Sequence, residues 1–328
     1  MIKLFTFLMI LFLSSSIFSQ YAAAPDSIGT SAIHKDSSII IDWATNLSIY
    51  RGYLDINDKN YKIAGSNRVN YGNTNMGVGE AQGNSVDCVS LGDSGVAIVT
   101  FASTIYNGQG PDFAIFENSF GDNYLELAFV EVSSDGSRFV RFPSVSNYPS
   151  QFQVGPYAYA DLRKVNNLAG KYRQGFGTPF DLEELKDSIG LDINAISHIK
   201  LIDVIGSVTN ILSLDSKGDT INDCYPTPFP SGGFDLDAVG VMYLNELGIE
   251  TLTPEQIVTI YPNPTKGVIY INAKENGLLT ITDVTGKIVY VKVIESQENI
   301  DVSLFEHTLL HVSFKSIYNA VNQMILVE

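Results

Sequence analysis

Short apolar runs separated by turn-forming residues are the feature that most constrains the fold of this chain. Runs rich in β-branched and aromatic residues recur between residues 38 and 244, and clusters of Gly, Asn, Asp, Ser and Pro separate them. Such runs are typical of β-strands, whereas a helix needs a longer stretch with an apolar period of 3.6 residues. The runs read SIIIDWA, GVAIVTFAS, DFAIFEN, LAFVEVSSDG, RFVRFPS, HIKLIDVIG and FDLDAVGVMYL. The pattern predicts an all-β main domain, a jelly roll or β-sandwich.

Two local signals add detail to this prediction. The sequence VSSDGSRFVRF indicates a hairpin, because Asp135-Gly136 supplies the positive φ values that a tight turn needs. Helical patterns are scarce, and DLEELKDSI (residues 181–189) is the best candidate, with Asp181 as its N-cap. We therefore expect one short helix in the main domain.

The ends of the chain differ in composition from its middle. Residues 1–19 combine Lys3 with an apolar stretch too short to span a membrane comfortably, which predicts a signal peptide. No other apolar stretch approaches 18 residues, so we expect no transmembrane segment in the mature protein. The composition shifts again near LGIETLTPE, and a second series of short strands follows. The predicted organisation is a main domain at 20–247, a linker at 248–256 and a small β-sandwich at 257–328.

Charge and cysteine content exclude some classes of partner and leave others open. The formal net charge of −16 argues against nucleic acid, whose phosphates need a basic surface, and favours cations such as Ca²⁺. Cys88 and Cys224 allow one disulfide in an exported protein. Two separate buried thiols are the favoured interpretation.

The catalytic motifs of common enzyme classes are missing from the sequence. Only four His occur, and no Ser lies in a G-x-S-x-G context. H-E-x-x-H, the P-loop and G-x-G-x-x-G after a strand do not occur either, so we expect no enzyme and assign no catalytic residue. A glycosidase with paired carboxylates is the alternative, although Trp43 is the only Trp available to stack on a sugar. Its candidate acids are Asp112, Glu117, Glu126, Asp235 and Asp237.

Two acidic segments far apart in the chain suggest a metal site. They read GPDFAIFENSF (110–120) and GGFDLDAVG (232–240). Asp235 and Asp237 would lie on one face of a strand and repel each other unless a positive group lay between them. Arg163, Lys171 or Arg173 could provide that charge in a purely structural network. The other solution is a structural Ca²⁺, with the ligands Asp112, Glu117, Asn118, Asp235 and Asp237.

A loop rich in aromatic residues is the candidate binding surface. Between residues 148 and 180, seven Tyr and Phe residues alternate with Gly, Pro and Asn. Binding residues are often carried by such loops on a β-scaffold, and Tyr and Arg are favoured there. We expect Phe176 and Phe180 in the core and Tyr157 and Tyr159 at the surface. The candidate ligand-binding residues are Tyr157, Tyr159, Tyr172 and Arg173.

The C-terminal segment resembles the sorting domain of the type IX secretion system of Bacteroidetes. The resemblance is carried by YPNPTKGVIYI (261–271) and LLTITDVTGKIVY (278–290). The last strands depart from the family, because HTLLHVSFKSIYNAVNQMILVE lacks the usual Gly-x-Tyr. The resemblance implies export by the type IX machinery to the cell surface or the extracellular space.

The main domain resembles bacterial cell-surface proteins of unassigned activity and, more distantly, galactose-binding-like jelly rolls. The matching text includes GPDFAIFENSF, LAFVEVSSDGSRFVRFPS, IKLIDVIG and PFPSGGFDLDAVGV. Some members of the cell-surface family are encoded beside cobalamin uptake genes, which implies corrinoid capture as one option. The expected function is therefore binding of a glycan or of a small nutrient such as a corrinoid, in partnership with an outer-membrane receptor if one exists. A surface polysaccharide hydrolase and a structural or adhesion protein remain the alternatives.

Overall fold

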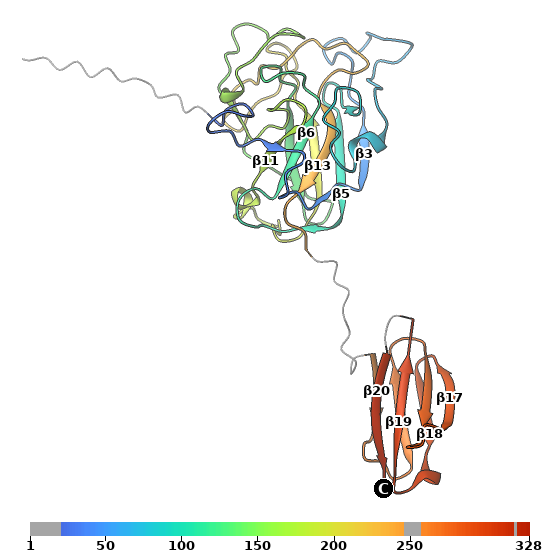
Figure 1. Ribbon diagram of the computed structural model, residues 1–328. Coiled ribbons are helices and arrows are strands. Elements are labelled where there is room, and N and C mark those ends of the chain that lie inside the picture. Colours follow the sequence, from blue (N-terminus) through green and yellow to red (C-terminus); the bar gives the residue numbers. More distant parts are fainter. Residues whose placement is uncertain (1–20, 246–256, 318–319) are drawn as a thin grey trace, which may run out of the picture. The chain divides into compact units, whose positions relative to one another are not determined.

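Two separate units make up the chain. The computed structural model describes residues 21–245, 257–317 and 320–328, and the predicted signal peptide and linker lie outside these ranges. Contacts within the chain divide it into residues 1–247 and 248–328 (Figure 1). Both units are built from β-strands, which confirms the predicted all-β class.

The first sheet of the N-terminal unit is antiparallel and has the order β1-β11-β6-β13-β2, with β4 also paired to β13. Its strands are β1 (Ile33–His34), β11 (Phe176–Phe180), β6 (Phe113–Glu117), β13 (Asp235–Val241), β2 (Asp42–Trp43) and β4 (Val89–Ser90). Every residue of β6 and β13 is buried. These two strands therefore form the centre of the sheet and carry both acidic segments of the sequence.

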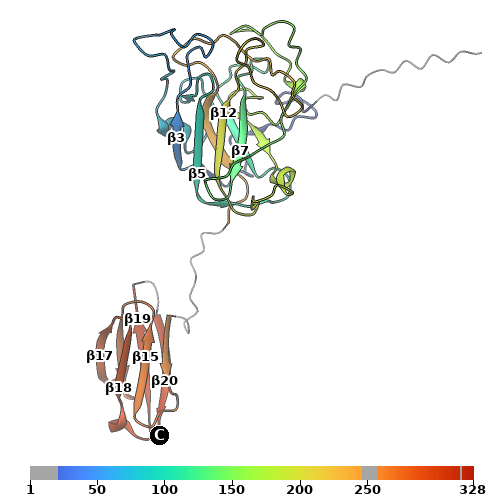
Figure 2. The same ribbon diagram turned by 180° about the vertical axis from the view of Figure 1, so that it is seen from behind.

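The second sheet lies behind the first and has the order β3-β5-β12-β7-β8 (Figure 2). Its strands are β3 (Asn46–Tyr50), β5 (Val96–Ile105), β12 (Ile196–Asp203), β7 (Ala128–Ser133) and β8 (Val140–Arg141). Two further short strands, β9 (Val145–Ser146) and β10 (Val165–Asn166), come after β8 in the chain and pair with each other. Burial alternates along most of β12, as expected for a strand with one face toward a core.

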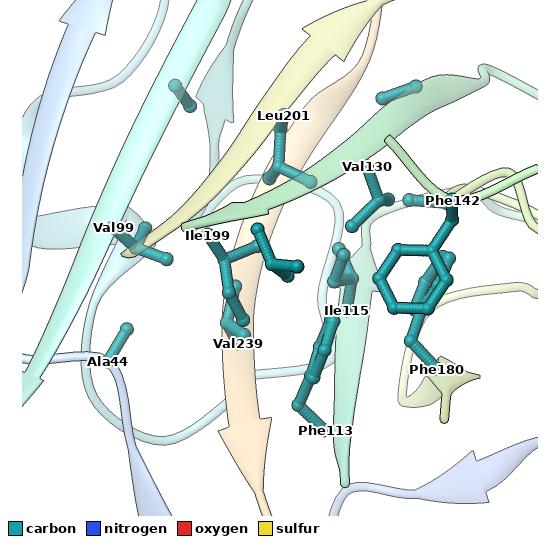
Figure 3. Close-up of a cluster of buried hydrophobic side chains, with 14 of the residues drawn as sticks. Ala44, Val99, Phe113, Ile115, Val130, Phe142, Phe180, Ile199, Leu201 and Val239 are labelled. Atoms are coloured by element: carbon teal, nitrogen blue, oxygen red, sulfur yellow. The ribbon is translucent and has the colours of Figure 1, made fainter. Parts of the chain in front are cut away.

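The core of this unit lies between the two sheets (Figure 3). Val99 and Leu201 from the second sheet and Phe113 and Ile115 from β6 belong to one buried cluster. The Phe113 and Phe180 rings stack with their centroids 5.4 Å apart. Apolar surface removed from water in this way stabilises the sandwich by roughly 25 cal/mol per Å².

The C-terminal unit is a second, smaller sandwich. One sheet contains β14 (Val258–Tyr261), β15 (Val268–Ala273) and β18 (Gln297–Asp301). The other contains β17 (Ile288–Ile294), β16 (Gly277–Thr282), β19 (Thr308–Lys315) and β20 (Ala320–Val327). The alternating burial of β15 directs Ile269 and Ile271 into a core of its own.

The helical elements that the structure describes are short 3₁₀ turns. These are η1 (Thr74–Gly77), η2 (Leu162–Lys164), η3 (Leu182–Leu185) and η4 (Ser303–Phe305). The predicted helix is η3, shorter than expected, and Asp181 is its N-cap because its side chain accepts from the Glu183 N–H. The predicted hairpin pairs β7 with β8, and Gly136 adopts a φ of +73° in its turn. Cys88 and Cys224 are separate buried thiols, as the favoured interpretation stated.

Candidate functional site

A cavity of about 430 Å³ opens where β6 ends and β13 begins. Long loops cover this end of the sandwich (Figure 1). Asn118 directly follows β6, Asp235 is the first residue of β13, and Glu126 precedes β7. We call this space the Glu126 cavity. Its lining consists of Tyr71, Ser85, Asn118, Phe120, Tyr124, Glu126, Tyr157, Phe229, Ser231 and Asp235.

Aromatic rings form much of the wall of the cavity. Phe120 stacks on Tyr124 with ring centroids 4.3 Å apart, and Tyr157 lies 5.8 Å from Phe229. The Tyr124 hydroxyl donates to the Pro156 carbonyl oxygen over 3.1 Å. Phe120 and Tyr157 are 60% and 67% exposed, so their faces are available to a ligand.

Two carboxyl groups, those of Glu126 and Asp235, line the cavity, and Glu117 lies near Asp235 behind them. Glu117, Glu126 and Asp235 are all buried. Burial, followed by the nearby Asp235 carboxyl, raises the pKa of Glu117 and of Glu126 well above its usual value. Burial also raises the pKa of Asp235, to about 7. Grouped carboxyl groups with raised pKa values are more common at functional sites than elsewhere in a protein.

The hydrogen bonds beside the cavity leave two carboxyl oxygens without a donor in strict hydrogen-bond geometry. Glu117 accepts from the Ser119 N–H through Oε2 at 2.8 Å, while its Oε1 has no partner. Asp235 accepts from Asn118 Nδ2 through Oδ2 at 3.1 Å. Its Oδ1 meets no donor within strict hydrogen-bond geometry, but the Ser90 hydroxyl on the paired strand β4 lies close enough to lower the pKa of this carboxyl. Glu126 is buried at the wall of the cavity, and the groups that act most strongly on its carboxyl are neighbouring acids rather than hydrogen-bond donors. Buried polar atoms are normally paired, so these oxygens need an explanation.

Arg51 lies close to Asp235 but does not form an ion pair with it within the described ranges. Its guanidinium donates to the carbonyl oxygens of Tyr71 and Gly72, each at 2.6 Å, and to that of Ser90. The positive charge lowers the pKa of Asp235 without overcoming the effect of burial. Sequence reasoning missed Arg51, because no local pattern marks an arginine that bonds to the backbone of a distant loop.

Three of the five predicted metal ligands come together, and two lie elsewhere. Glu117, Asn118 and Asp235 meet at the cavity, which is the expected tie between an early strand and the closing strand. Asp112 precedes β6, and the six residue steps from Asp112 to Asn118 along the strand span about 20 Å. Its carboxylate accepts from the N–H groups of Gly108 and Leu182, each at 2.7 Å. The five residues therefore cannot ligate one ion together.

Asp237 also differs from the prediction. Its carboxylate accepts from the N–H groups of Gln82 and Gly83 at 2.9 and 2.8 Å. A register shift between Leu236 and Ala238 interrupts the alternation that would have placed Asp237 beside Asp235. Across the described parts of the chain, no three His, Cys, Asp or Glu side chains are arranged to hold a metal ion. A structural Ca²⁺ stays a prediction.

The three basic residues considered as neutralising partners are engaged elsewhere. Arg173 pairs with Asp122 and Asp26, each at 2.6 Å, and Arg163 pairs with Asp161 at 2.9 Å. The buried Lys171 donates to the Val165 carbonyl oxygen at 3.0 Å. The prediction that one of them neutralises the acids is therefore wrong, because each has a nearer partner on its own loop or on a neighbouring one.

The predicted aromatic binding residues have different environments. Tyr157 lines the Glu126 cavity, while Tyr159 lines a separate hollow beside Asp161 and Arg163. Both are exposed, as predicted. Tyr172 is only 1% exposed, and its hydroxyl bonds to Ser31 Oγ at 2.8 Å. It therefore belongs to the core and cannot present its ring to a ligand.

The remaining aromatic predictions concern packing. Phe180 is buried and Phe176 packs against a buried cluster, as expected. Sequence reasoning missed the cavity residues Phe120, Tyr124 and Phe229. Their spacing gives no sign that they meet, but Phe120 does follow the acidic segment of β6 directly.

A family model for the secretion system C-terminal sorting domain matches residues 259–328. This match confirms the predicted type IX sorting domain and indicates export to the cell surface or the extracellular space. A sorting domain of this kind interacts with the type IX secretion machinery. In the residues that the structure describes, no helix has the length and apolarity needed to cross a bilayer.

Comparison with other proteins adds little about the N-terminal unit. No curated protein sequence matches the chain. The β-glucuronidase of Ruminococcus gnavus is similar at 7% identity with a TM-score of 0.18, over 72% of this chain and 34% of that one. The β-glucuronidase of Faecalibacterium prausnitzii has 10% identity and a TM-score of 0.18, over 88% of this chain and 45% of that one. The β-glucuronidase of Parabacteroides merdae has 10% identity and a TM-score of 0.23, over 87% of this chain and 35% of that one. The chain spans less than half of each enzyme, and likeness at this level carries no argument.

Proposed function

We propose that the chain is an exported surface protein that binds a small saccharide in the Glu126 cavity. The observation that carries the proposal is the pairing of exposed aromatic faces with hydrogen-bonding groups at the base of one cavity. Sugar rings present an apolar face, which packs on aromatic rings, and hydroxyl groups, which donate to carboxylates. Phe120 and Tyr157 offer the first kind of contact, and the carboxyl oxygens of Glu126 and Asp235 offer the second.

The size of the cavity supports a saccharide over a corrinoid. A volume of about 430 Å³ is at the small end of the range for ligand pockets. One or two sugar rings suit this space, whereas a corrin macrocycle with its nucleotide loop would extend beyond it. Capture of a corrinoid together with an outer-membrane receptor is the alternative that the test must address.

The test uses the mature chain without residues 1–19, a glycan array, and calorimetric titrations with the best glycan and with cobalamin. Tyr157→Ala should weaken glycan binding at least tenfold, because it removes one wall of the cavity. Tyr159→Ala is the matched control: its ring is 71% exposed but lies at a different hollow, so affinity should not change. Equal losses in both variants, or binding of cobalamin alone, would contradict the proposal. No measurable binding of any glycan or of cobalamin would favour a structural or adhesion role.

A second candidate function is hydrolysis of a surface polysaccharide. Glu126 and Asp235 line the same cavity, and their raised pKa values suit a proton donor in glycoside cleavage. This candidate predicts release of reducing ends from a bound glycan and loss of that release in Glu126→Gln. A glycan that binds and is recovered uncleaved after long incubation would leave binding as the function.

A further inference from the structure

Buried carboxyl groups at the base of the Glu126 cavity call for a proton or a positive partner. Glu126 is 7% exposed and lines the cavity, and neighbouring acids act on its carboxyl more strongly than hydrogen-bond donors do. Glu117 Oε1 and Asp235 Oδ1 are buried and have no donor within strict hydrogen-bond geometry. An ionised carboxylate left in this state is costly unless a cation or hydrogen-bond donors approach it.

The protein does not supply that cation within the described residues. No Lys, Arg or His lines the cavity. Arg51, whose positive charge acts on Asp235, donates hydrogen bonds to the carbonyl oxygens of Tyr71, Gly72 and Ser90. These carboxyl groups are therefore either protonated, as the direction of their pKa shifts indicates, or paired with a positive group that a ligand brings from outside the chain.

The walls of the cavity show which kind of cation fits. Ca²⁺ requires six to eight oxygens that converge on one point, and the acids of the described residues do not converge in that way. An alkylammonium group instead accepts carboxylates on one side and the faces of aromatic rings on the others. Phe120, Tyr124, Tyr157 and Phe229 provide such rings around the acids.

We infer that the ligand of the Glu126 cavity carries a protonated amine, which binds between the aromatic wall and the carboxylates of Glu126 and Asp235. This inference rests on the proposed saccharide-binding function and narrows the ligand to amino sugars with a free amine. Glu126 makes the direct contact with the ammonium group. Asp235, held by Asn118, contributes its Oδ1, the oxygen that has no donor within strict hydrogen-bond geometry and lies near the Ser90 hydroxyl.

Three β-1,4-linked disaccharides that differ only at carbon 2 test the inference. They are the glucosamine disaccharide with free amines, its N-acetylated form, and cellobiose, which has hydroxyl groups at those positions. Calorimetric titration of the mature chain at neutral pH should give at least tenfold tighter binding of the free amine than of either neutral sugar. Glu126→Gln should remove this preference, because the isosteric amide keeps the shape of the site and loses the charge.

Glu80→Gln is the matched control, since Glu80 is exposed outside the cavity and the change in net charge is the same. It should keep the preference. If Glu126→Gln does not fold, the comparison of the three sugars on the unchanged protein still decides. Equal binding of all three sugars would leave the proposed function in place and overturn the inference. A preference for the free amine that survives in Glu126→Gln would also overturn the inference. So would failure of the amine to bind together with a melting temperature that EDTA lowers and Ca²⁺ restores.

Discussion

Buried aspartates hold the loops of the N-terminal unit in place by accepting backbone N–H groups. Asp203 accepts from Phe234 and Ser94 at 2.7 and 3.1 Å, and Asp223 accepts from Leu127 and Cys224, each at 2.7 Å. These carboxylates satisfy donors that would otherwise be buried without a partner. At the residue scale, an acid inside this protein is therefore more often a structural acceptor than part of a site.

The acid Asp223 makes stability depend on pH in a direction opposite to that of a salt-bridged carboxylate. Burial raises the pKa of Asp223 to about 7, so the folded state holds a proton that the unfolded chain releases near pH 4. Stability is then greatest below the unfolded pKa and is lost as the pH rises toward 7, by on the order of 3 kcal/mol for this group. Urea unfolding between pH 4 and 8 should show this fall.

The control is Asp223→Asn, which removes the titrating group but also costs one backbone hydrogen bond. The variant should be less stable than the parent at pH 4, and its stability should depend less on pH, so that the difference shrinks or reverses by pH 8. A parent protein whose stability increases from pH 4 to 8 would contradict the assignment.

At the scale of elements, single side chains link strands to turns. Asp112 connects the start of β6 to the loop at Gly108 and to η3 through Leu182. Asp112→Asn should lower the free energy of unfolding by about 2 kcal/mol, because an amide offers one acceptor oxygen and leaves a buried N–H unpaired. Asp181→Asn is the matched control, since Asn caps a helix as well as Asp and its effect should be a few tenths of a kcal/mol. Equal effects in chemical denaturation would show that the link through Asp112 contributes nothing.

The strands were predictable from the sequence, and the connections between them were not. Runs such as GVAIVTFAS and HIKLIDVIG became β5 and β12, because a β-branched run between turn residues has few other stable conformations. The bulge at Asp237 could not be foreseen, since it depends on pairing with β6, more than 100 residues earlier. For the site, the sequence predicted a polar contact between the segment after β6 and the start of β13, and the hydrogen bond between Asn118 and Asp235 is such a contact. The position of Glu126 beside the aromatic rings of the cavity was not predictable, because it depends on loop conformations that no local sequence pattern determines.

At the scale of the whole molecule, the sorting-domain match and the candidate site fall in different units. The C-terminal unit carries the match to the sorting domain, and the candidate site lies wholly within the N-terminal unit. Deletion of residues 257–328 should therefore leave the protein inside the producing cell, as measured by fractionation and surface proteolysis, without changing saccharide affinity of the purified remainder. Transfer of residues 257–328 to a carrier with a signal peptide is the matching gain-of-function control. Surface display of the truncated chain would contradict this expectation.

The place of β13 in the first sheet determines when that sheet can be completed. β13 is the last strand of the N-terminal unit in sequence, yet it pairs with β6, β2 and β4, whose residues were synthesised long before. The sheet lacks one of its two central strands until residue 241 has left the ribosome, and contacts so distant along the chain form slowly. Because β13 is the last strand of the first sheet to be made, we expect that sheet to close late. Late closure lengthens the time for which the new chain remains unfolded, and so the time in which it can be exported unfolded.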